Sequence, residues 1–139
     1  MTLIAIQIDS KRSTQITIIA GLAALLLLLV GCGGGPGLAA PVDQPRAREA
    51  LKTVLDGWKE GKKPDDLKAA TPSIVVQDFD WMGGARLLAY EVGGEGKNDD
   101  ANLRIPVTLT LKTAKGDVKK NVTYLVGTDP VLTVFRDFN

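Results

Sequence analysis

The sequence predicts an α+β domain in which helices come first and an antiparallel sheet follows. Three observations lead to this prediction. Apolar residues recur at steps of three and four from Ala47 to Trp58, which places them on one face of a helix. After Pro72 the composition changes to β-branched and aromatic residues, which favour strands. From Leu103 to Lys112 apolar and polar residues then alternate, as in a strand with one buried face.

The first expected element is an amphipathic helix. Asp43 can cap its N-terminus, Pro45 is tolerated in its first turn, and Gly61 favours its end. A second, short helix is expected from Pro64, because the two aspartates that follow this proline favour the positive end of a helix dipole. The apolar stripe of the first helix consists of Ala47, Ala50, Leu51, Val54, Leu55 and Trp58.

Four or five antiparallel strands are expected after the helices, and we expect the helices to pack on a curled sheet. The turns between the strands are indicated by glycine, proline and polar residues. Pro106 indicates an edge or a bulge in its strand. The expected strands are 74–81, 86–92, 103–112, 118–126 and 131–138.

This layout is similar to the cystatin-like or nuclear transport factor 2-like superfold. Residues 50–61 (ALKTVLDGWKEG) resemble openings common in that group, where a long helix ends in an aromatic residue and a glycine turn before a second short helix. The resemblance implies a cone of sheet wrapped on the N-terminal helix, often with a pocket at its open end. Fold alone does not settle function.

The N-terminal segment has the layout of a secretory signal peptide. Lys11 and Arg12 give a short positive region, the stretch from Ile16 to Val30 carries no charge, and small residues follow. A membrane-spanning helix usually needs about 20 apolar residues. The shorter run in this chain therefore favours a cleaved leader over a spanning segment.

The end of this leader resembles the lipobox of bacterial lipoproteins. The residues Leu29-Val30-Gly31-Cys32 fit the Leu-x-Gly/Ala-Cys pattern, and Cys32 is the single cysteine. The resemblance implies cleavage between Gly31 and Cys32, a diacylglycerol on the thiol, and further acylation of the new amine, with palmitate as the expected acyl group. Two or more acyl chains hold a protein stably at a membrane. Because Gly33 replaces the Asp that retains such proteins at the inner membrane, the outer membrane is favoured if the cell has one.

We therefore expect three segments. Residues 1–31 form the signal peptide, residues 32–45 form the lipidated cysteine and a flexible Gly/Pro tether, and residues 46–139 form one α+β domain. Removal of the leader takes away two basic residues and one acidic residue, which leaves 15 of each sign. A neutral chain without a basic stripe gives no electrostatic reason to expect a nucleic-acid partner.

The chemistry-bearing residues are few. The chain has no histidine, and its one thiol is assigned to the lipid. Ser-His and Cys-His nucleophile pairs are therefore excluded, as are zinc sites built from histidine and cysteine. We expect no catalytic residue, no metal and no cofactor, and we expect the protein not to be an enzyme.

Two carboxylates are candidates for a paired site. Asp78 and Asp80 lie two residues apart in the expected strand 74–81 and would share one face. Paired carboxylates can divide acid and base roles when their environments differ. The simpler interpretation, which we favour, places both carboxylates on the solvated face while Phe79 and Trp81 enter the core.

Two functions remain as hypotheses. The favoured one is an envelope lipoprotein whose domain binds an envelope protein partner or has a structural role, without catalysis. The alternative is a ligand-binding or enzymatic domain that uses the open end of the cone. Its pocket would contain Trp58, Asp78, Asp80 and Tyr90.

Overall fold

The computed structural model describes residues 40–138, which form the α+β domain that the sequence predicts. The expected signal peptide, the cleavage site at Gly31, the lipidation site at Cys32 and the first part of the tether lie outside the described residues. None of the helices in the described range has the length and hydropathy needed to cross a membrane.

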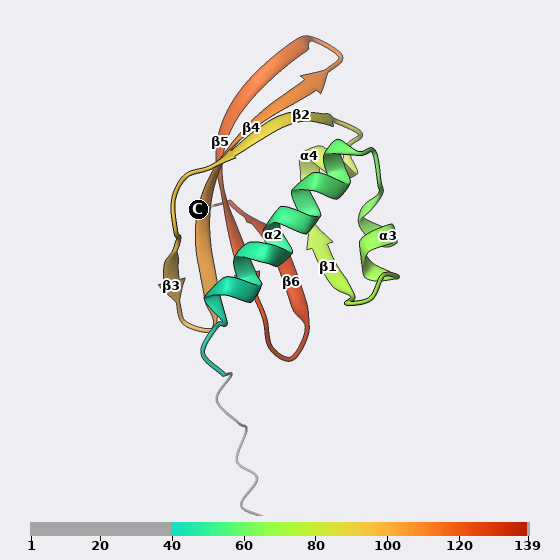
Figure 1. The fold of residues 1–139 in the computed structure, drawn as a ribbon. Helices are drawn as coiled ribbons and strands as arrows, with labels where there is room; N and C mark the ends of the chain where they lie inside the picture. Colours follow the sequence, from blue (N-terminus) through green and yellow to red (C-terminus); the bar gives the residue numbers. More distant parts are fainter. Residues whose placement is uncertain (1–39, 139) are drawn as a thin grey trace, which may run out of the picture. The chain divides into compact units, whose positions relative to one another are not determined.

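The elements follow the chain as three helices and six strands within this range (Figure 1). The helices are α2 (Gln44–Lys59), α3 (Pro64–Lys68) and α4 (Phe79–Met82). The strands are β1 (Ile74–Gln77), β2 (Arg86–Val92), β3 (Lys97–Asp99), β4 (Asn102–Thr113), β5 (Gly116–Gly127) and β6 (Leu132–Asp137).

Helix α2 occupies the segment with the apolar stripe. The Asp43 carboxylate accepts a hydrogen bond from the backbone N–H of Arg46 at 3.1 Å, which satisfies one of the free donors of the first turn. After Lys59 the chain turns at Gly61, whose φ of 86° suits a residue without a side chain. The residues that α2 buries are Ala47, Ala50, Leu51, Val54, Leu55, Gly57 and Trp58.

The sheet is mixed, and the expectation of a purely antiparallel sheet is therefore wrong. Its strand order is β1-β6-β5-β4-β2, with β3 paired to β4. Strands β2 to β6 pair antiparallel, whereas β1 pairs parallel with β6, in a register that places Ile74 beside Leu132. Turn signals reveal only pairings between strands that follow one another, and β1 pairs with the strand farthest from it in the sequence.

The strand expected over residues 74–81 ends four residues early. β1 stops at Gln77, and the next residues form α4 instead of continuing the strand. The cause is Asp78, whose side chain accepts from the backbone N–H of Trp81 and caps a helical turn. β3 is an additional short strand, which lies inside the segment where the sequence indicates a polar loop.

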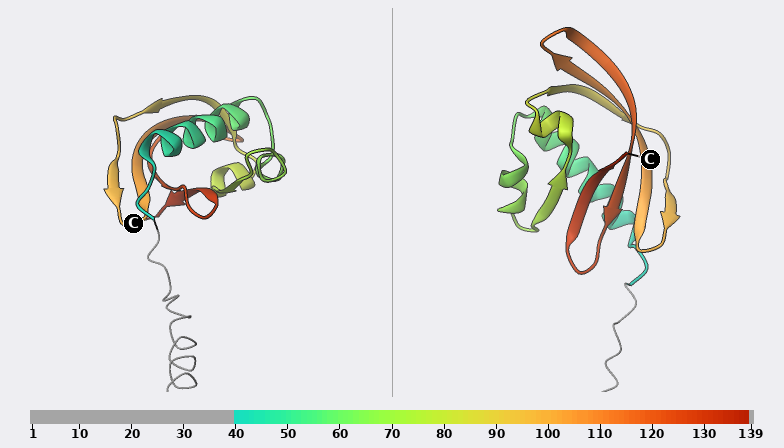
Figure 2. Two further views of the ribbon diagram at one scale, coloured as in Figure 1. Left: turned by 60° about the horizontal axis from the view of Figure 1, so that its bottom comes forward. Right: turned by 180° about the vertical axis from the view of Figure 1, so that it is seen from behind.

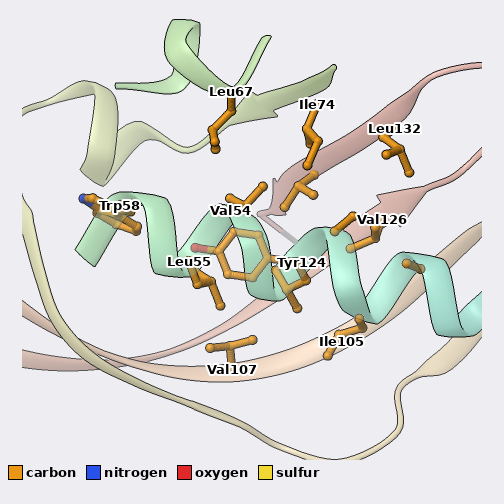
Figure 3. Close-up of a cluster of buried hydrophobic side chains, with 14 of the residues drawn as sticks. Val54, Leu55, Trp58, Leu67, Ile74, Ile105, Val107, Tyr124, Val126 and Leu132 are labelled. Atoms are coloured by element: carbon orange, nitrogen blue, oxygen red, sulfur yellow. The ribbon is translucent and has the colours of Figure 1, made fainter. Parts of the chain in front are cut away.

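The core lies between α2 and the concave face of the sheet. The sheet curls around α2, while α3 and α4 lie to one side of this helix (Figures 1 and 2). Figure 3 shows Val54 and Leu55 of α2 with Ile105 and Val107 of β4 on one side and Ile74 and Leu132 on another. Large side chains fill this interior; those under 2 % exposed, together with Trp58, are Tyr124, Leu51, Leu55, Leu87, Leu103, Ile105, Leu109, Leu111, Val54, Val126 and Val134.

Candidate functional site

Asp78 is a buried charge, not a surface carboxylate. Only 1 % of the residue is exposed, and its Oδ1 accepts from the Trp81 N–H at 3.1 Å. Phe79, by contrast, is 57 % exposed. The expectation that Asp78 lies on the solvated face while Phe79 enters the core is therefore wrong at both residues, because Asp78 starts a helical turn and alternation ends there.

The second oxygen of Asp78 joins α4 to the sheet. Oδ2 accepts from the Tyr124 hydroxyl at 2.6 Å and from Nε and Nη2 of Arg136 at 3.0 and 2.7 Å. The Arg136 guanidinium also lies 5.4 Å from the centroid of the Tyr124 ring. Burial, together with the Asp78 charge, raises the pKa of Tyr124 well above its ordinary value. The buried hydroxyl and the buried carboxylate of this cluster therefore both have partners, as buried polar groups require.

Asp80 extends the cluster toward solvent. Its Oδ2 lies 3.2 Å from Nη1 of Arg136, and its Oδ1 lies 2.7 Å from Nζ of Lys120. Asp78, Arg136, Asp80 and Lys120 thus form a chain of alternating charges. In the described part of the molecule no three acidic, cysteine or histidine side chains are grouped to hold a metal ion. Each carboxylate of this network is matched by a cation, Asp78 by Arg136 and Asp80 by Arg136 and Lys120.

Tyr90 lies in a different contact. Its hydroxyl donates to Oδ1 of Asp56 at 2.7 Å, and Asp56 also bonds Nζ of Lys52. Burial and this hydrogen bond raise the pKa of Tyr90 to about 12. The hydrogen bonds from Lys52 and Tyr90 lower the pKa of Asp56. The pocket expected from Trp58, Asp78, Asp80 and Tyr90 is therefore not assembled, because Tyr90 is bonded to α2 and the two aspartates to β5 and β6.

A hollow lies where α2, α3, β1, α4 and β2 meet. It has a volume of about 610 Å³. Its inner wall includes Trp58 and Trp81, whose rings stack at 5.2 Å with an interplanar angle of 8°. Their indole N–H groups donate to the backbone oxygens of Ala85 and Lys62, so the rings are fixed in place. The residues that line the hollow are Trp58, Gly61, Lys62, Lys63, Pro64, Asp65, Val76, Trp81, Met82, Gly84, Ala85 and Arg86.

The rim of this hollow is cationic. Lys62, Lys63 and Arg86 line it together with one carboxylate, that of Asp65. Nζ of Lys62 lies 2.9 Å from Oε2 of Glu60, so Lys63 and Arg86 are the cations of the rim without an ion pair among the described residues. Apolar walls with a few charged groups at the mouth suit a ligand that has an apolar body and an anionic end. Of the four residues expected from the sequence to form a pocket, Trp58 lines this hollow and the other three do not.

The sequence did not reveal the residues that complete the ion-pair network of Asp78 or those that line the hollow. Nothing near Arg136 in the sequence relates it to Asp78, since the two residues are 58 positions apart. Lys62 and Lys63 have the character of a turn before a helix, and Arg86 that of the start of a strand. The one usable signal was Asp78 itself, because an aspartate before an aromatic-rich stretch and a Gly-Gly pair fits a capped helical turn.

Comparison with known proteins assigns no family to this geometry. No protein-family model, no curated protein and no solved structure matches the chain. A function for the protein therefore depends on the residues and contacts described above.

Proposed function

We propose that this chain is a bacterial envelope lipoprotein, exported and held at the membrane by a lipid on Cys32, with a domain that binds a partner without catalysis. The observation that carries the proposal is the order of features at the N-terminus: positive charge, an apolar run, and Leu29-Val30-Gly31-Cys32. An outer-membrane location is part of the proposal where the cell has that membrane, because Gly33 lacks the retention signal.

The contacts of the carboxylates support a non-catalytic domain. Asp78 has both oxygens occupied by donors, and Asp80 bridges Arg136 and Lys120. A general acid or base needs to reach its substrate and to change its protonation state. A carboxylate that is 1 % exposed and paired with a buried guanidinium is poorly placed to reach a substrate.

The cationic hollow supports a binding role, for which the partner would present an acidic group beside an apolar one.

The alternative function is a catalytic or ligand-binding cone. It has one supporting feature, the resemblance to the cystatin-like or nuclear transport factor 2-like group, in which a sheet curls around the first long helix. The position of α2 within the curled sheet supports that resemblance as a proposal (Figure 2).

The anchor is tested by intact-mass measurement on protein extracted from membranes of the native host. We expect the loss of residues 1–31 and the added mass of a diacylglycerol and acyl groups. Cys32→Ser is expected to leave the protein unprocessed or to release it from membranes, whereas the control Gly35→Ala is expected to behave as wild type. A Cys32→Ser protein that has lost residues 1–31 and still fractionates with membranes as wild type does would overturn the lipid anchor.

The binding role is tested by chemical crosslinking in intact membranes. Lys63→Glu with Arg86→Glu reverses the charge of the rim and is expected to abolish crosslinks to a partner. Lys97→Glu changes an exposed lysine on β3, away from the hollow, and serves as the control. Crosslinks that persist in the double variant would separate the hollow from partner binding.

A further inference from the structure

The strand β5 has one edge that is only half covered. Its residues Thr123–Gly127 pair with β6, whereas Gly116–Asn121 pair with β4 and with no other strand among the described residues. The hairpin of β4 and β5 projects from the rest of the domain (Figures 1 and 2). The backbone groups on the uncovered side of Gly116–Asn121 are therefore a template for another strand.

Two side chains of this exposed segment carry opposite charges and lie two residues apart. Asp117 and Lys119 point to the same face of the sheet, because side chains alternate along a strand. Neither side chain forms an ion pair within the described part of the chain, whereas Lys120 on the other face is paired with Asp80. Between the two lies Val118, which is 38 % exposed.

We propose that two copies of this chain associate through the β5 edge, as an antiparallel pair related by a two-fold axis perpendicular to the sheet. Such an axis makes the two sheets continuous, with the same face upward in both copies. Residues that lie opposite each other across the axis then have side chains on the same face of the joined sheet. In the register that places Val118 opposite its own copy, Asp117 faces Lys119 of the second copy, and the same pair repeats on the other side of the axis.

Charge selects this register over its neighbours. The nearest registers that keep paired side chains on the same face are reached by sliding one strand by two residues. In one direction Asp117 then lies opposite Asp117 of the second copy, and in the other Lys119 lies opposite Lys119. Like charges directly opposite each other are destabilising. Within each hairpin Asp117 also faces Lys112 of β4, so the dimer has a row of alternating charges across the joined sheet. The paired edges are short, and we expect a weak, reversible dimer.

A competing role for the lysines is protection of the edge, since lysine on an edge strand disfavours pairing with other chains. The two roles differ in their response to charge. If Lys119 blocks pairing, its replacement by an acidic residue does not weaken association. If Lys119 pairs with Asp117 of a second copy, that replacement weakens association, and reversing both charges together restores it.

The test is sedimentation in detergent of the chain as purified from membranes, over a range of concentrations. We expect wild type to dimerise, and Lys119→Asp and Asp117→Lys each to raise the dimer dissociation constant about tenfold or more. The double variant Asp117→Lys with Lys119→Asp is expected to return to within about threefold of wild type. Lys97→Asp makes the same charge change away from the hairpin and is expected to leave the constant unchanged.

A second measurement reports the register without relying on charge. In a Cys32→Ser background, Val118→Cys places two thiols opposite each other across the axis, and we expect a disulfide-linked dimer under mild oxidation. Gly35→Cys in the same background is the control for random collision. A wild-type chain that stays monomeric at every concentration would overturn the proposal. Dimers that ignore both charge reversals and form no disulfide in the Val118→Cys variant would overturn it as well.

Discussion

The Oδ2 atom of Asp78 lies 2.7 Å from Nη2 of Arg136, although 58 residues separate them in the chain. Asp78 directly follows β1, and Arg136 lies within β6, the strand with which β1 pairs in parallel. The ion pair therefore holds the end of β1 and the start of α4 against the last strand. Both side chains are more than nine-tenths buried, so the pair is shielded from screening by salt.

Removal of the Asp78 carboxylate tests how much this ion pair contributes to the stability of the fold. Asp78→Ala leaves the Arg136 guanidinium buried and without its main partner, and we expect the free energy of unfolding to fall by about 3–5 kcal/mol in urea denaturation. Asp80→Ala is the matched control, since Asp80 is more exposed and its loss is expected to cost about 1 kcal/mol or less. Equal losses for the two variants would contradict the assigned roles.

The two tyrosines of the chain give a direct readout of the buried hydroxyls. Burial raises the pKa of Tyr90 from 10.0 to about 12, and burial also raises that of Tyr124. Because the folded state keeps the Tyr90 proton longer than the unfolded state does, the stability from this group is complete below pH 10 and is lost as the pH rises through about 12. In the folded protein we therefore expect little phenolate absorbance at about pH 10.5, against strong absorbance in denaturant.

The variant Tyr90→Phe separates the two hydroxyls. We expect it to remove the phenolate signal that the folded protein develops near pH 12, so that Tyr124 titrates only when the protein unfolds. A folded wild-type protein whose phenolate absorbance rises at about pH 10, as it does for a free tyrosine, would contradict the buried positions of both hydroxyls.

The stacked indoles of Trp58 and Trp81 predict a spectroscopic signature. These are the two tryptophans of the chain, and parallel rings at 5.2 Å couple their electronic transitions. We expect a paired positive and negative band in far-ultraviolet circular dichroism that Trp81→Phe abolishes. Trp81→Phe also deletes the hydrogen bond to the Lys62 oxygen, which we expect to cost about 0.5–1.5 kcal/mol in urea denaturation. Retention of the bands in Trp81→Phe would show that the two rings are not coupled.

The start of α2 gives a prediction of smaller size. The Asp43 carboxylate caps the first turn, and its backbone N–H donates to Oγ1 of Thr128. Asp43→Ala removes the side-chain acceptor alone, and we expect a loss of about 1 kcal/mol in unfolding free energy. Asp43→Asn keeps an oxygen in place and is expected to lose much less. If both variants unfold alike, the cap contributes little to the stability of the helix.

Local patterns in the sequence were sufficient for the helix α2 and for the hairpin of β4 and β5. In α2 the apolar stripe, the cap and the terminating glycine all agree with the structure. In the hairpin, a turn before Gly116 joins β5 to β4, in which buried and less buried residues alternate. The class α+β follows from these elements, because the helix and the hairpin each have an apolar face that must be buried against the other.

The remainder depends on contacts that no short window of sequence contains. The parallel pairing of β1 with β6 joins segments far apart in the sequence, with Ile74 beside Leu132, and Arg136 is needed to explain why Asp78 is buried. Residues 79–82 are too few to establish a helical period, so a strand pattern that continues to Trp81 was the natural prediction. The hollow at Trp58 is assembled from five separate elements and has no sequence signature of its own.

Because β6 is the last strand of the described domain, the domain can form only late in synthesis. β1 has no neighbour to pair with until Leu132–Asp137 has been made, because its described partner in the sheet is β6 alone. A chain that leaves a ribosome or a translocation pore with its N-terminus first exposes the apolar side of α2 before the closing strand arrives. The domain is therefore expected to complete its core only after the closing strand has emerged.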